Sequence, residues 1–129
     1  MLGRTIDNSW FHTQTNATLV DEGAGVYKTS AGIDITGYRV VGIRFPSGWT
    51  TSDINFLECT TSGGTYMNIY DTGDASTDSA KVLINSAVAS SYIPLNIDAF
   101  NGVNFIKVSS VTDQTSAKVP VLYLEKVIS

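Results

Sequence analysis

Residues 53–71, with the sequence DINFLECTTSGGTYMNIYD, decide the fold class of this chain. Two runs rich in aromatic and β-branched residues flank the turn at 62–64, and glycine can take the positive φ that a tight reversal needs. In the first run Ile54 and Phe56 alternate with polar residues, which predicts one face turned into a core. The segment is therefore predicted to be a β-hairpin.

The second run of this hairpin carries apolar groups on both faces. Met67 and Ile69 alternate with Asn68, while Tyr66 and Tyr70 share the opposite face. Side chains at alternate positions of a strand lie on opposite faces of the sheet. We therefore expect one face to pack in the core and the other to pack against a loop or a partner.

The rest of the chain repeats this pattern of short apolar runs separated by glycine and polar clusters. No window carries an i, i+3, i+4, i+7 apolar stripe long enough for a helix. The predicted strands are 25–28, 38–45, 53–60, 65–71, 80–85, 91–95, 103–109 and 119–128. They favour an all-β fold, an antiparallel β-sandwich that is jelly-roll-like, with helix limited to a turn near 99–100 or 87–90.

Residues 1–20 differ from the sandwich domain predicted over 21–129. They are mostly polar, with a Trp10-Phe11 pair among few apolar anchors. We expect an extended N-terminal arm whose Trp10 and Phe11 dock on a neighbouring molecule. The alternative is that the arm folds back over its own sheet.

Composition limits the function classes. The 129 residues hold 8 Lys+Arg and 12 Asp+Glu, a net charge of −4, and only 16% are charged. Without runs of Lys or Arg the chain does not resemble a nucleic-acid-binding protein, because phosphate neutralisation needs clustered cations. It holds no apolar stretch long enough to cross a membrane and no signal-peptide pattern, so we expect no membrane partner and synthesis in a cytoplasm.

Candidate chemistry is sparse. The single Cys59 excludes an intrachain disulfide and a cysteine-based zinc site within one chain, and the single His12 adds no second soft ligand. Asp71, Asp74 and Asp78 could offer oxygen ligands to Ca²⁺, but the loop lacks the spacing of a dedicated calcium site and reads equally as a solvated loop. We therefore predict no metal, no cofactor and no enzymatic activity, with Cys59 as a small buried side chain.

The aromatic residues are the remaining candidates for binding. Flat rings stack on sugars or anchor protein interfaces, although most aromatic rings simply lie in a core. Trp49 follows a Pro-Ser-Gly turn, where a tryptophan commonly caps the end of a sandwich. The predicted partner-binding residues are Trp10, Phe11, Trp49, Tyr66 and Tyr70.

The order of motifs adds a resemblance. The stretches VVGIRFPSGWT (40–50), INF (54–56), SGGTY (62–66) and IYD (69–71) are followed by YIPL (92–95), FNGV (100–103), FIKVSS (105–110) and PV (120–121). This ordered set resembles a family of small virion proteins of tailed phages and covers 38–128. The chain departs from that pattern at 109–117, where it carries a longer loop.

The resemblance implies an accessory head component, built on a β-sandwich, that decorates or cements a capsid. The expected partner is the major capsid protein, and the expected location is the outside of a phage head. We expect a homo-oligomer, with a homotrimer at three-fold positions favoured. The alternative from another class is a glycan-binding module, such as a carbohydrate-binding or phage fibre or tail domain, in which exposed aromatic rings stack on a sugar.

Overall fold

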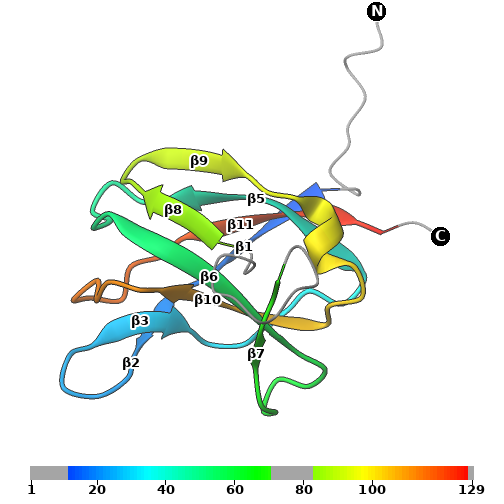
Figure 1. Ribbon diagram of the computed structural model, residues 1–129, viewed down its shortest axis with the longest axis horizontal. Helices are drawn as coiled ribbons and strands as arrows, with labels where there is room; N and C mark the ends of the chain where they lie inside the picture. The colour runs from blue at the N-terminus through cyan, green and yellow to red at the C-terminus, as the bar shows by residue number, and fades with distance from the viewer. Residues whose placement is uncertain (1–11, 71–82, 128–129) are drawn as a thin grey trace, which may run out of the picture.

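Two antiparallel sheets pack face to face in the computed structural model, which describes residues 12–70 and 83–127. The four-stranded sheet has the order β1 (His12–Asn16), β11 (Val121–Lys126), β5 (Tyr38–Phe45), β9 (Ser91–Pro94). The second sheet has the order β2 (Leu19–Asp21), β3 (Tyr27–Ser30), β10 (Phe105–Ser110), β6 (Ser52–Cys59), β7 (Met67–Asn68), with β4 (Ile33–Asp34) on β10 and β8 (Leu83–Ala87) on β6. The predicted all-β sandwich is confirmed (Figure 1).

The core lies between the two sheets and follows the alternation of the sequence. Ile106 and Val108 of β10 are fully buried, as is Leu122 of β11, while the residues between them remain partly exposed. Phe56 of β6 meets Phe100 edge to face at 5.4 Å. Because most inward side chains of the central strands are apolar, the two inner faces exclude water; Ser52 and Ser110 are buried at the end where β6 begins and β10 ends.

The hairpin at the centre of the sequence forms, with a shorter second strand than predicted. β6 pairs with β7 through Leu57 opposite Asn68 and Glu58 opposite Met67. Neither glycine of the turn adopts a positive φ; instead, a Cβ on Gly64 would lie 2.5 Å from the Cys59 sulfur. Glycine is needed there because the chain passes close to Cys59, which is buried as predicted.

The second half of the expected arm is part of the sandwich. β1 pairs with β11 along its whole length. Ala17 and Leu19, which follow β1 in the chain, are buried. The domain therefore begins by residue 12 and not at 21. The sequence HTQTN resembles an arm because an edge strand needs backbone pairing but few apolar side chains. Trp10, Phe11 and the carboxylates of 71–78 lie outside the described residues.

Within 12–70 and 83–127 the helical content is a single 3-10 turn, η3 (Ile97–Phe100), close to the turn predicted at 99–100. Asn96 caps it by accepting the N–H of Asp98 at 3.2 Å. The turn follows β9 and directs Phe100 into the core. It also places Asp98 beside the end of β5, where the site described below begins.

The longer loop at 111–117 is held by a buried glutamine. Gln114 is completely buried, and its Oε1 accepts the N–H of Thr50 at 2.7 Å. Its Nε2 donates to the Thr50 carbonyl at 2.8 Å and to the Ser110 hydroxyl at 3.1 Å. The two bonds to Thr50 tie the loop 111–117 to the turn that follows β5, and the bond to Ser110 ties the loop to the end of β10.

Asp113 in the same loop should make the stability of the fold depend on pH under acidic conditions. Asp113 accepts the N–H groups of Tyr27 and Thr115, and these bonds lower the pKa of its carboxyl group. A lowered folded-state pKa contributes stability above the unfolded value of about 3.9, which is lost as the pH falls through the folded-state pKa. In urea unfolding between pH 5 and 2, we expect Asp113→Asn to lose less stability than the wild type. Equal losses of stability in the two proteins would contradict this role of Asp113. The pKa of Asp34 is also lowered, but Asp34 is present in both proteins and its effect cancels in the comparison.

Candidate partner-binding face

The outer face of the four-stranded sheet carries the candidate site. Leu122 and Leu124 of β11 point into the core, so Tyr123 and Glu125 between and beyond them point outward. β1 and β5 flank β11, with Gln14 opposite Tyr123 on one side and Gly42 on the other. The face therefore presents side chains from strands that are far apart in the sequence.

Two tyrosines from different strands meet at its centre. Tyr92 of β9 and Tyr123 of β11 contact edge to face at 5.0 Å, and Tyr92 is 49% exposed. Gly42 of β5 lies between the strands that carry them. Glycine is needed there because a Cβ would collide with the phenol of Tyr92. The register shifts beside Gly42, which leaves Val41 without a direct partner on β11. Such a bulge re-aims side chains, and Val41 joins the tyrosines.

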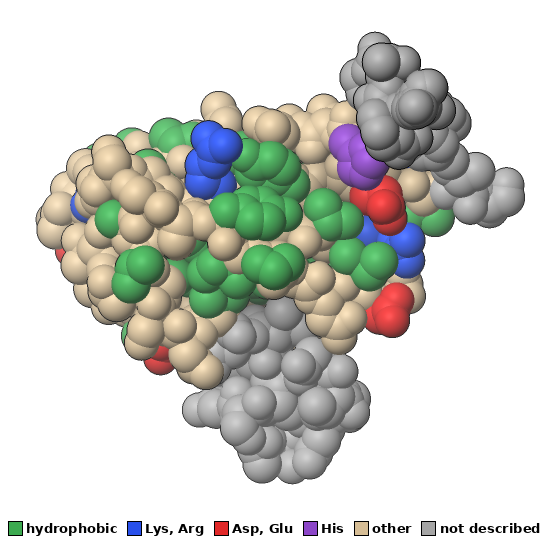
Figure 2. Space-filling view, turned by 90° about the horizontal axis from the view of Figure 1, so that it is seen from above, with side chains coloured by type: hydrophobic (Ala, Val, Ile, Leu, Met, Phe, Trp, Pro, Cys, Tyr) green, Lys and Arg blue, Asp and Glu red, His purple; other side chains and the backbone are tan. Residues whose placement is uncertain are grey.

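These residues border a shallow hollow of about 290 Å³. Its lining consists of His12, Thr13, Gln14, Val41, Tyr92, Tyr123 and Leu124. Figure 2 shows hydrophobic side chains gathered across the middle of this face, between a basic group on one side and charged groups with a histidine on the other. We call the surface formed by Val41, Tyr92 and Tyr123 the aromatic patch.

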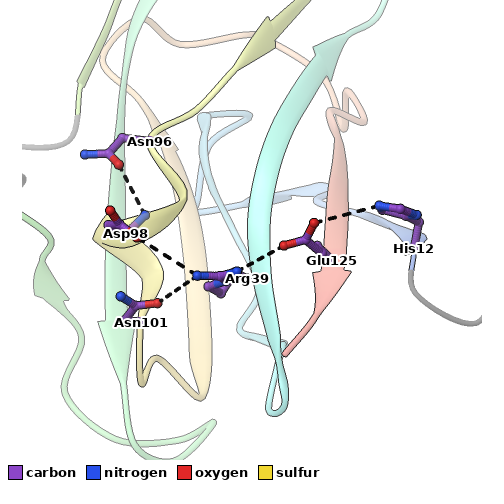
Figure 3. A network of polar contacts seen from close by, with 6 residues as sticks. All are labelled: His12, Arg39, Asn96, Asp98, Asn101 and Glu125. Carbon is purple, nitrogen blue, oxygen red and sulfur yellow. Dashed lines mark hydrogen bonds and ion pairs between the residues drawn. The ribbon is translucent and has the colours of Figure 1, made fainter. Parts of the chain in front are cut away.

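Charged groups occupy one end of the face (Figure 3). Arg39 on β5 contacts Glu125 at 3.1 Å, Asn101 at 3.4 Å and Asp98 at 4.0 Å. Glu125 also lies 3.9 Å from His12 Nε2. This network joins β1, β11, β5 and η3, so it fixes one border of the patch with partly exposed charges whose individual contributions are about 1 kcal/mol or less.

A single basic residue marks the opposite end. The guanidinium carbon of Arg44 lies 5.8 Å from the centre of the Tyr123 ring, within cation–π range. Arg44 is exposed, with its side chain on the outer face of β5. Tyrosine and arginine are enriched in the cores of protein interfaces, so this juxtaposition is typical of a docking surface.

Of the predicted partner-binding residues, the three that the structure describes, Trp49, Tyr66 and Tyr70, lie away from this face. Trp49 is 4% exposed and packs on Phe45 at 4.9 Å, so it caps the sandwich end and is not an exposed platform. Tyr66 and Tyr70 are half-buried on the side of the second sheet. The Tyr66 hydroxyl donates to the Ser62 carbonyl at 2.9 Å, Lys107 covers its ring at 4.4 Å, and burial raises the pKa of its phenol.

The aromatic patch had one signal in the sequence, the alternation that turns Tyr123 outward. What the pattern did not supply was the neighbour of Tyr123, because Tyr92 reaches it only through the pairing of β9 and β11 with β5. Within 12–70 and 83–127 no three His, Cys, Asp or Glu side chains gather as a metal site. In the same part of the chain, no helix is long and apolar enough to span a membrane.

Comparison with known proteins adds one distant likeness. No family model matches the chain, and no curated protein matches it. The crystal structure of the SPBc2 prophage-derived protein YomS is similar to it at 14% identity and a TM-score of 0.49, over 90% of this chain and 95% of that one. At this level the likeness supports no inference about function.

Proposed function

We propose that this protein is a non-enzymatic structural protein of a phage virion that decorates or cements the head by binding the major capsid protein. The host cytoplasm is the site of assembly, and the exterior of the head is the final location. The observation that carries the proposal is the exposed aromatic patch on a rigid sheet, bordered by charges at both ends. The resemblance of 38–128 to head decoration proteins supplies the class of partner.

The geometry suits adhesion. The patch lies on three paired strands, β5, β9 and β11, so backbone hydrogen bonds fix the positions from which its side chains project and little backbone freedom is lost on binding. In protein interfaces a central apolar region usually supplies affinity, while charges at the rim orient the partner. The aromatic patch and the charges at its two ends have this arrangement. Repeated over a symmetric shell, modest contacts become strong through multivalency.

The proposal is tested with heads that lack this protein. We expect the purified protein to bind them saturably, at a number of sites set by the capsid symmetry, and to raise the temperature at which the heads open. The measurements are co-sedimentation and a thermal release assay. Absence of binding at tens of micromolar protein to intact, mature heads would contradict the proposal.

The hollow beside the patch favours one second candidate, a glycan-binding module. Its volume of about 290 Å³ and its mixture of rings with the amide of Gln14 are compatible with a sugar ring. The two tyrosines are nearly perpendicular, at 81°, so they present one ring face and not a flat platform. Specific hits on a glycan array, together with absence of head binding, would favour this candidate.

Self-association is part of the proposed function. A decoration protein meets its lattice at symmetry axes, and a closed ring of subunits satisfies each contact. From the sequence we expect a homotrimer at three-fold positions. Light scattering of the free protein and its occupancy on heads test this expectation against the competing two-fold association that the edge of β1 supports, which is argued below.

A further inference from the structure

β1 is the outer strand of the four-stranded sheet, and no strand among the described residues pairs with its outer edge. We propose that two copies of this chain associate through that edge, with their β1 strands antiparallel about a two-fold axis at Gln14. The inference concerns assembly of the free protein and goes beyond the binding of a head.

The direction of the backbone groups follows from the register. Ala17 donates its N–H to the Pro120 carbonyl at 2.7 Å, and Leu19 donates to Lys118 at 3.0 Å. In an antiparallel pair the residues bonded to a given neighbour alternate. Thr13 and Thr15 therefore face β11, whereas the N–H and C=O groups of Gln14 and Asn16 point away from the sheet. A second strand needs these outward groups as its partners.

The sequence HTQTN is self-complementary when reversed on itself. With Gln14 opposite Gln14 of the second copy, the two residues exchange N–H···O bonds, and Asn16 has the same orientation as Gln14. Thr13 then lies opposite Thr15 in both halves, at the closer non-hydrogen-bonded positions. Cross-strand threonine pairs are favourable in antiparallel sheets. Registers centred on residue 13 or 15 overlap fewer of the five strand residues.

Charge and shape both leave this edge open to a like strand. Strand β1 has no Lys, Arg, Asp, Glu or Pro, and its pairing with β11 has no register shift. Natural proteins usually protect free edges with lysine, proline, bulges or very short strands. The opposite edge of the same sheet is β9, which ends in Pro94, and β2 at the border of the second sheet has three residues. The edge of β1 lacks these protections.

The dimer would join two four-stranded sheets into one sheet of eight strands. Both aromatic patches would then lie on the same continuous outer face, on either side of the two-fold axis. A partner with repeated sites could bind both patches at once, which raises avidity without new contacts.

Introducing a charge at Gln14 tests the pairing in the 129-residue chain. The Gln14 side chain is exposed, so Gln14→Lys and Gln14→Glu should melt at the same temperature as the wild type when all three are measured at concentrations where the wild type is monomeric. Across the axis they place like charges directly opposite, which opposes pairing. By sedimentation equilibrium we expect a wild-type dimer, each variant alone weakened about fivefold or more, and a 1:1 mixture of the two variants restored to a dimer.

Two further measurements make the outcome decisive. Gln14→Pro removes an outward-pointing N–H, and an edge strand accepts proline at such a position. Because the proposed pairing needs that N–H, this variant should abolish the dimer. Val88→Lys, an exposed substitution away from β1, should leave the dimer intact. A wild-type monomer at about 100 μM, a trimer, or a dimer indifferent to the Gln14 variants would each overturn the inference. Head binding is scored separately, so failure of the dimer and failure of the proposed function are distinguishable.

Discussion

Replacing Gln114 by leucine is expected to lower the free energy of unfolding by about 3 kcal/mol, which corresponds to a fall of roughly 10 °C in melting temperature. Leucine fills a similar volume, so the loss reports on hydrogen bonds and not on a cavity. The N–H and C=O of Thr50 would both lose their hydrogen-bond partner. The Ser110 hydroxyl would lose the hydrogen bond that it accepts from Nε2. Urea and thermal unfolding followed by circular dichroism measure the effect.

A nearly isosteric variant separates hydrogen bonding from packing. Gln114→Glu replaces the Nε2 donor with an oxygen that faces the Thr50 carbonyl. Burial and the facing carbonyl oxygen of Thr50 disfavour the carboxylate, although the Thr50 N–H still donates to it, so we expect the folded-state pKa of this glutamate to be raised above its unfolded value of about 4.3. Its penalty should therefore be small below pH 4 and grow as the pH rises toward neutrality. A penalty independent of pH, or a leucine variant as stable as the wild type, would contradict the assigned role.

Removing the aromatic patch is expected to abolish head binding while the domain stays folded. In Tyr92→Ala/Tyr123→Ala, each ring lost from the centre of an interface costs about 2 kcal/mol or more, so the combined affinity should fall at least about 100-fold. The edge-to-face contact itself contributes only about 1 kcal/mol to folding. Co-sedimentation with heads and the melting temperature, measured on the same preparation, report the two effects.

Two variants make this test specific. Gly42→Ala deletes nothing, but its Cβ would displace the phenol of Tyr92, so it should weaken head binding and leave the tyrosines present. Met67→Ala truncates a side chain that is 64% exposed on the second sheet and should leave binding unchanged. Wild-type binding by the double tyrosine variant would move the attachment surface away from this face.

The alternation of apolar residues was sufficient to predict most of the core. It predicted the strand at 38–45 with its observed bounds and the inward face of Ile54 and Phe56. This information is local, because a side chain two positions along a strand returns to the same face whatever the strand pairs with. Burial of that face then follows from the hydrophobic effect.

Polar positions were decided by the tertiary structure. The sequence HTQTN carries no apolar pattern, so β1 was predicted as part of an arm, although its backbone pairs with β11. Gln114 lies in a segment that reads as a surface loop, yet it is fully buried because its amide satisfies both backbone groups of Thr50. A hydrogen bond between residues distant in the chain leaves no periodic trace in the sequence.

The sequence by itself determined that the chain folds as a β-sandwich and which side of the central strands faces inward. Only the tertiary structure decided which outward residues form a surface. Tyr92 and Tyr123 meet because β9 and β11 both pair with β5, and the bulge at Val41 adds a third side chain to them. Strand order depends on the summed free energy of all pairings and of the core they enclose, so a surface assembled across strands is a property of the whole fold.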